Sequence, residues 1–399
     1  MVRHLAALLA VAVVGLAAGC SPSGTPSADT SGPIVLGGVF DLSATASTLG
    51  KPAQQGAQLA VDEINGRGGV LGRTLELGSA DEGCDTSKGV AATRKYMSER
   101  AFMLFGFSCS PVALAVKPLA EAQHIPMLVT TATATAISRP PAHYVFDSNV
   151  SAADEAKSVA NLVLPRFKPH KVAVAYVGND YGKSAADGVK AVLEAKGLGS
   201  GYQGVEIPLD ATDYRAQSLI LARSRPDVIL VVAYSTPPLI KALKQAGVTA
   251  PVVSFSGGVL AATVTPLAQQ GLLNGFVSSW YAPTELSTTS TSKAMSDFVQ
   301  AYHRRYGQYP DSTALQGYQG IKLVQKALEK AGAVDADKFV NAMESFETVD
   351  FSLGMPMGFS ATDHSGADRM SLVQFESNEA PGGKGLYGSV KIFSAPAGS

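Results

Sequence analysis

The chain has 399 residues, which is long for one ordinary domain and comfortable for two. Lysine and arginine total 32 against 33 for aspartate and glutamate, and this near-zero charge offers no support for a nucleic-acid partner, so we predict none. A hydrophobic fraction of 46% is sufficient for large cores.

Residues 1–20 are typical of a bacterial export signal. An apolar run over residues 5–18 is shorter than the ~20 residues that span a bilayer and suits the core of a signal peptide. Small residues lead to Cys20 as in a lipobox, although Ala17 stands where leucine is usual. We predict that Cys20 is lipidated, the alternative being an ordinary cleaved signal. Residues 21–32 are rich in Ser, Pro, Gly and Thr and predict a flexible tether.

From residue 33 the chain alternates strands and helices in two series. The first series comprises strands at 34–40, 75–80, 103–107 and 127–130 and helices at 52–65, 88–100 and 112–123. The second comprises helices at 153–164, 182–196, 213–224 and 239–246 and strands at 172–177, 205–209, 228–234 and 252–256. A strand at 276–280 and helices at 292–306 and 312–331 follow. Two βα series predict two α/β lobes with parallel sheets, and ligands of such sheets bind outside the carboxyl ends of the strands.

Enzyme signatures are scarce. No phosphate-binding loop occurs, and residues 106–110 lack the last glycine of a G-x-S-x-G nucleophile elbow. The six histidines are scattered without an i, i+4 pair for a metal. We therefore predict a protein that is not an enzyme and has no cofactor and no metal. A secreted hydrolase that uses Ser108 or Ser110 is the alternative.

Hydroxyl side chains gather where two of the predicted strands end. Ser108 and Ser110 follow the strand at 103–107, and alternating threonines fill residues 130–135 after the next strand. Such hydroxyls, with backbone N–H groups of the following helix, can hold a carboxylate. The alternative is helix capping by Ser110 and Thr133 without a ligand.

Several motifs, in order along the chain, resemble one family. Residues 56–73 read GAQLAVDEINGRGGVLGR and look like the signature of the leucine/isoleucine/valine-binding proteins, the type I periplasmic binding proteins of branched-chain amino acid importers. Residues 81–85 (DEGCD), 179–182 (NDYG), 225–228 (RPDV) and 317–318 (GY) are similar to further motifs of that family. The resemblance covers residues 33–375, nearly the whole mature chain.

The resemblance implies two Rossmann-like lobes joined by a three-stranded hinge. The first lobe would comprise residues 33–147 plus 275–348, and the second residues 148–274 plus 349–399. It also implies a monomer, anchored by lipid outside the cytoplasmic membrane, that delivers its ligand to the permease and ATPase subunits of an ABC importer. A ligand-sensing receptor of the same fold is the alternative.

The cysteines other than Cys20 form one candidate pair. In an oxidising compartment Cys84 and Cys109, which follow neighbouring strands, predict a disulfide, and the family has one at these positions. Two buried free thiols are the alternative.

The same likeness implies a ligand-binding site. The implied residues are Leu49, Ser108, Ser110, Thr131, Ala132, Thr133, Tyr181, Tyr234, Ser235 and Gly257. Where the family has a glutamate for the ligand's ammonium, this chain reads Ser256-Gly257-Gly258, and Leu49 replaces an aromatic residue. A buried ammonium without a counter-charge is costly. The ligand class is therefore a small carboxylate or other polar compound, either an amino acid or, as we prefer, an aromatic or acyl acid or amide without the amine.

Overall fold

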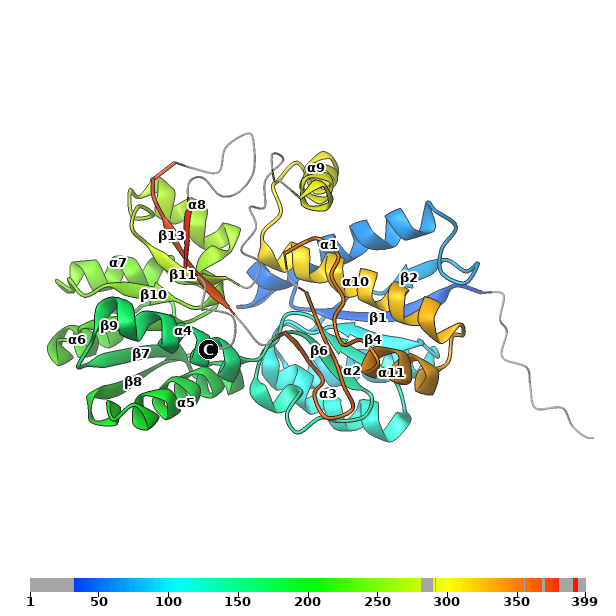
Figure 1. Ribbon diagram of the computed structural model, residues 1–399, viewed down its shortest axis with the longest axis horizontal. Helices are drawn as coiled ribbons and strands as arrows, with labels where there is room; N and C mark the ends of the chain where they lie inside the picture. The colour runs from blue at the N-terminus through cyan, green and yellow to red at the C-terminus, as the bar shows by residue number, and fades with distance from the viewer. Residues whose placement is uncertain are drawn as a thin grey trace, which may run out of the picture. The chain divides into compact units, whose positions relative to one another are not determined.

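Two β-sheets, each flanked by helices on both faces, form the fold (Figure 1). The computed structural model describes residues 32–280, 290, 292–354, 356–367, 370–379 and 390–393. None of the helices in these ranges is long and apolar enough to cross a membrane. The α/β class and the two-sheet architecture predicted from the sequence are confirmed.

The first sheet contains the strands of the first βα series. Its order is β12-β6-β5-β4-β1-β2, β3 also pairs with β1, and the pairings are parallel. Its strands are β1 (Ile34–Phe40), β2 (Leu75–Leu77), β3 (Ala80–Asp81), β4 (Met103–Gly106), β5 (Met127–Val129), β6 (Val145–Val150) and β12 (Ser365–Ala367). Buried residues of α1 (Ser47–Asn65), α10 (Ser312–Ala331) and α11 (Ala336–Glu344) pack on one face, and those of α2 (Thr86–Ser98) and α3 (Ser110–Gln123) on the other.

The apolar character of β1 follows from this double coverage. Leu36 and Phe40 belong to the core under α1 and α10, whereas Val39 belongs to the core under α3. Successive side chains of a strand point to opposite faces, so a strand covered on both faces needs apolar residues at nearly every position.

The second sheet contains the strands of the second series. Its order is β14-β13-β11-β10-β9-β7-β8, parallel except that β13 runs antiparallel to β11 and to β14. Its strands are β7 (Val172–Val177), β8 (Tyr202–Ile207), β9 (Val228–Val232), β10 (Val252–Ser254), β11 (Val277–Trp280), β13 (Ser371–Phe375) and β14 (Val390–Phe393). Helices α4 (Ala152–Phe167) and α5 (Asp180–Ala195) pack on one face, and α6 (Arg215–Ser224) and α7 (Pro237–Gln245) on the other. The remaining helices are α8 (Ala261–Gln269) and α9 (Lys293–Tyr306).

Both sheets have a topological switch point. In the first sheet the order reverses between β1 and β4, and in the second between β7 and β9. The connections from two such neighbouring strands leave on opposite faces of the sheet and open a crevice at their carboxyl ends. The loops after β1, β4, β7 and β9 are therefore the expected walls of a ligand site.

The chain crosses between the two sheets three times, after β6, after β11 and after β12. Two crossings differ from the predicted lobe boundaries. β11 pairs with β10 in the second sheet, although residues 275–348 were assigned to the first lobe. A short connection through α8 favours a strand that joins the neighbouring edge. β12 pairs with β6 in the first sheet, although residues 349–399 were assigned to the second lobe.

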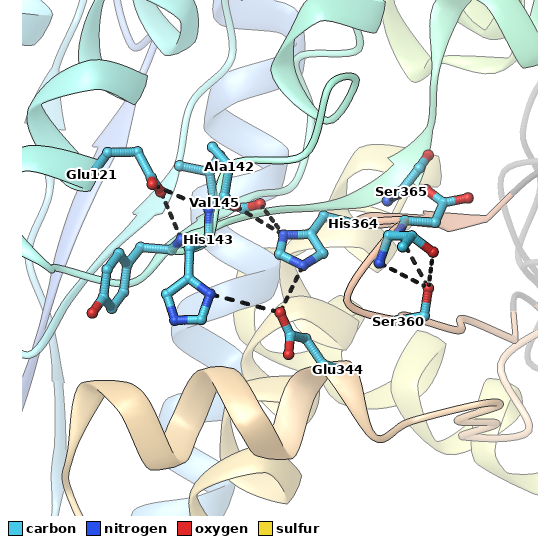
Figure 2. Close-up of polar contacts among 11 residues, drawn as sticks. Glu121, Ala142, His143, Val145, Glu344, Ser360, His364 and Ser365 are labelled. Atoms are coloured by element: carbon cyan, nitrogen blue, oxygen red, sulfur yellow. Dashed lines mark hydrogen bonds and ion pairs between the residues drawn. The ribbon is translucent and has the colours of Figure 1, made fainter.

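A buried histidine fixes β12 to the first sheet (Figure 2). His364 Nδ1 lies 3.0 Å from the carbonyl oxygen of Ala142 and 2.9 Å from that of Val145. Its Nε2 lies 3.2 Å from Oε1 of Glu344, the last residue of α11. The ring therefore joins the returning chain to β6 and to α11, an attachment that the sequence alone did not indicate.

Two glycines allow α1 and α10 to pack backbone against backbone. A Cβ atom at Gly56 would lie 1.8 Å from the carbonyl oxygen of Ala314, and one at Gly317 would lie 1.9 Å from that of Ala53. Both glycines belong to motifs that resemble the family signature. This close packing fixes the first turns of α10 beside the strand ends of the first sheet.

Candidate functional site

A cavity lies at the carboxyl ends of strands from both sheets. Residues from the side of the first sheet, from the side of the second sheet and from α10 form its walls. They are Leu49, Ser108, Ser110, Thr131, Ala132, Thr133 and Asn149 from the first side, Tyr181, Ala233, Tyr234, Ser256, Gly257 and Leu260 from the second side, and Ser312, Thr313 and Gln316 from α10.

The structure brings together all of the predicted site residues except Ser235. At that loop the wall is made by Ala233 and Tyr234, and the chain then turns toward α7, which begins at Pro237. The polar wall residues that were missed are Asn149, Ser256, Ser312, Thr313 and Gln316. A polar residue within a buried strand and a glutamine on the buried face of a helix are the signals that point to Asn149 and Gln316.

The two serines after β4 present hydroxyl protons to the cavity. Ser108 Oγ accepts a hydrogen bond of 3.0 Å from the backbone N–H of Asp41, and Ser110 Oγ accepts one of 3.1 Å from the N–H of Ala134. Because a lone pair of each hydroxyl is already engaged, its proton remains for an acceptor. These serines are therefore suited to bind a carboxylate or carbonyl oxygen.

Glu82 accepts hydrogen bonds from two backbone N–H groups just before α3. Its Oε1 accepts from the N–H groups of Ser108 (2.9 Å) and Cys109 (2.7 Å), and Oε2 has no hydrogen-bond partner among the described residues. Burial raises the pKa of this carboxyl group to about 8, although the two N–H groups oppose the shift. An internal carboxyl group therefore occupies these two backbone N–H groups, whereas the predicted role of the N–H groups within the helix itself stays a prediction.

Two tyrosines form the opposite wall. Tyr181, in the first turn of α5, and Tyr234, after β9, stack with ring centroids 5.6 Å apart. Asn179 Nδ2 donates a 2.8 Å hydrogen bond to the Tyr234 hydroxyl oxygen, so the Tyr234 proton remains available to a ligand. Burial raises the pKa of Tyr234, and the hydroxyl stays protonated at neutral pH.

A buried carboxyl group lies behind Ser256. Glu155 Oε1, from α4, accepts from the Ser256 N–H (2.7 Å) and from Ser279 Oγ (2.5 Å). Burial raises the pKa of Glu155, and the hydroxyl of Ser279 and the groups of Ser256 oppose the shift. Glu155 thus connects α4 to strand β11 and to the loop that follows β10. It is not one of the residues that line the cavity.

No described residue that lines the cavity has a charged side chain or an imidazole. Hydroxyls and amides supply the polarity, and Leu49 and Leu260 supply aliphatic surface. Within this wall Ser108 and Ser110 have no base that would make them nucleophiles. The arrangement is suited to holding a small molecule by neutral hydrogen bonds.

The Sγ atoms of Cys84 and Cys109 lie at bonding distance, as in a disulfide, and their Cα atoms are 5.4 Å apart. The pair connects the segment after β3 to the residue that precedes α3. Cys20, the predicted lipidation site, lies outside the described residues.

The profile of a family described as periplasmic binding proteins matches residues 33–380. The chain belongs to this family. The Leu/Ile/Val-binding protein homolog 7 of Brucella abortus (strain 2308) is 26% identical to this binding protein over 387 residues, which cover 94% of each chain. The leucine/isoleucine/valine-binding type indicated by the sequence motifs is therefore confirmed.

Solved structures share the fold of this binding protein. The fatty acid ABC transporter substrate-binding protein from Thermomonospora curvata is 26% identical, with a TM-score of 0.76 over 91% of this chain and 93% of that one. The branched-chain amino acid transporter substrate binding protein LivJ from Streptococcus pneumoniae, in complex with isoleucine, is 20% identical, with a TM-score of 0.76 over 91% and 100% of the two chains. Members of this family work outside the cytoplasm, bind small ligands and are not enzymes as a class.

Proposed function

We propose that this protein is the lipid-anchored solute-binding subunit of an ABC importer and that its ligand is a small organic carboxylate without an ammonium group. Cys20 would hold the protein at the outer face of the cytoplasmic membrane, and the ligand would lie in the cavity between the strand ends of the two sheets. The Cys84–Cys109 pair would be oxidised there. Closure of the lobes over the ligand would produce the form that docks on the permease.

The uncharged lining of the cavity is the observation that supports this ligand class. Ser108, Ser110 and Tyr234 each accept a hydrogen bond through the hydroxyl oxygen, which leaves the hydroxyl proton for a ligand acceptor. An ammonium would have no carboxylate partner among the described lining residues, and a buried cation without a partner is strongly disfavoured. The similar structure from Thermomonospora curvata is a fatty acid ABC transporter substrate-binding protein, and a fatty acid is a carboxylate without an amine.

A thermal-shift screen of organic carboxylates against the protein without residues 1–20 tests the proposal, because a ligand that binds only the folded state raises the melting temperature. The strongest hit would then be titrated calorimetrically into the wild type, Ser110→Ala and Thr133→Ala. Loss of a hydrogen bond to a charged group should weaken binding by about 1–3 kcal/mol in each variant. Equal affinity in all three proteins would show that the carboxylate is held elsewhere.

A further inference from the structure

We propose that the first two turns of α10 bind a second polar group of the ligand, and that this group is uncharged, a hydroxyl or an amide rather than an ammonium. This inference rests on the proposed function and specifies the ligand beyond its carboxylate.

Gln316 is the first observation. Its side chain lines the cavity, only 4% of the residue is exposed, and its side-chain oxygen Oε1 has no hydrogen-bond partner among the described residues. A buried polar group without a partner costs free energy, and buried amides in folded proteins are nearly always paired. A ligand group in the cavity would supply the missing partner.

Thr313 is the second observation. It lines the cavity one turn before Gln316, and its hydroxyl donates a 2.8 Å hydrogen bond to Oδ1 of Asp311. Since the proton is engaged, Thr313 offers only lone pairs to a ligand. The ligand group beside Thr313 must therefore be a hydrogen-bond donor.

Asp311 precedes the subsite in the chain, but its carboxylate does not face the cavity. Its buried carboxylate accepts from the N–H groups of Thr313, Ala314 and Ala261 as well as from the Thr313 hydroxyl. Three of these bonds go to Oδ1 and one, of 3.3 Å from the Ala261 N–H, goes to Oδ2, and Asp311 does not line the cavity. A cation at the subsite would lack a direct counter-charge, whereas a neutral donor needs none.

The subsite on α10 lies beside the loop after β5, which follows the serines in the cavity wall. Thr313, Gln316 and Gly320 recur at helical spacing on one side of α10, and a Cβ atom at Gly320 would lie 2.8 Å from Thr130 Cγ2. That side of α10 consequently faces the loop after β5, which contributes Thr131 and Thr133 to the cavity. A ligand can thus place an acceptor at the serines and a neutral donor at α10.

Calorimetry with matched ligands tests the inference. The probes are 4-methylpentanoate, its 2-hydroxy derivative and leucine, and benzoate with 4-hydroxybenzoate. In the wild type at least one hydroxylated probe should bind roughly 3- to 10-fold more tightly than its parent, the value of one neutral hydrogen bond. Gln316→Met should reduce that ratio to about 1. The control Gln325→Met, on the same helix but with its amide donating to Glu329, should preserve the ratio.

A second variant tests the charge of the group directly. Gln316→Glu adds a carboxylate at the same place, and it should shift the preference from the 2-hydroxy acid toward leucine. If the parents bind but neither hydroxylated probe binds more tightly, or if the ratio survives in Gln316→Met, the inference is overturned and the proposed function stands. If leucine is the best ligand of the wild type, or if none of the five probes binds, both are overturned.

Discussion

Glu82 should make the stability of the protein fall as the pH rises. Its carboxyl group is fully buried, and its pKa rises from an ordinary 4.5 to about 8 because burial disfavours the charged form. Between these values the folded state holds a proton that the unfolded state has lost, so the free energy of unfolding decreases with pH. From pH 5 to pH 8 the loss from this one group is roughly 3–4 kcal/mol, at ~1.4 kcal/mol per unit of pKa.

Glu82→Gln removes this titration and keeps the acceptor for the Ser108 and Cys109 N–H groups. Urea unfolding of the wild type and the variant at pH 5, 6, 7 and 8 gives the difference in free energy of unfolding at each pH. That difference should shift in favour of the variant by roughly 3–4 kcal/mol between pH 5 and pH 8. Glu194→Gln, on the exposed surface beside Lys190, should show no such shift. Parallel pH profiles for the wild type and Glu82→Gln would refute the reasoning.

Three further variants test other parts of the site. Tyr234→Phe should weaken binding of a carboxylate ligand by about 1–3 kcal/mol, because one hydroxyl donor to a charged group is lost. Equal calorimetric affinity would place the ligand away from Tyr234. In urea unfolding, Glu155→Ala should destabilise the protein by about 1–3 kcal/mol more than Glu155→Gln does. The alanine leaves the Ser256 N–H and the Ser279 hydroxyl without their buried acceptor. Equal free energies of unfolding for the two variants would contradict the role of Glu155 in connecting α4 to β11. Thiol counting on unfolded, unreduced protein with Cys20→Ala should find no free thiol, and two free thiols would exclude the disulfide. Replacing the pair by serine should cost about 3.5 kcal/mol for a 25-residue separation.

The sequence was informative where each residue's environment is set by its immediate neighbours along the chain. β1 and β7 are apolar runs bounded by turn residues, and both lie where they were expected. The serine and threonine loops after β4 and β5 were found because loops at the carboxyl ends of parallel strands share one edge of the sheet.

Features that depend on distant parts of the chain were missed. Gln316 comes to the cavity because Gly56 and Gly317 let α10 pack closely on α1, two elements far apart in the sequence. Glu155 lies in a helix with ordinary amphipathic spacing, and only the tertiary fold places it behind Ser256. β12, with the sequence Ser-Gly-Ala, has no strand propensity of its own and pairs with β6 through the attachment at His364.

Calorimetric titration with leucine and with 4-methylpentanoate, which is leucine without its ammonium group, tests the central claim most directly. The two compounds share the carboxylate and the branched chain, so their difference in affinity reports only on the amine. A cavity whose described lining has no charged side chain should bind 4-methylpentanoate more tightly than leucine. Leucine binding at micromolar strength or tighter, with weaker or no binding of 4-methylpentanoate, would contradict the account and identify this protein as an amino acid carrier.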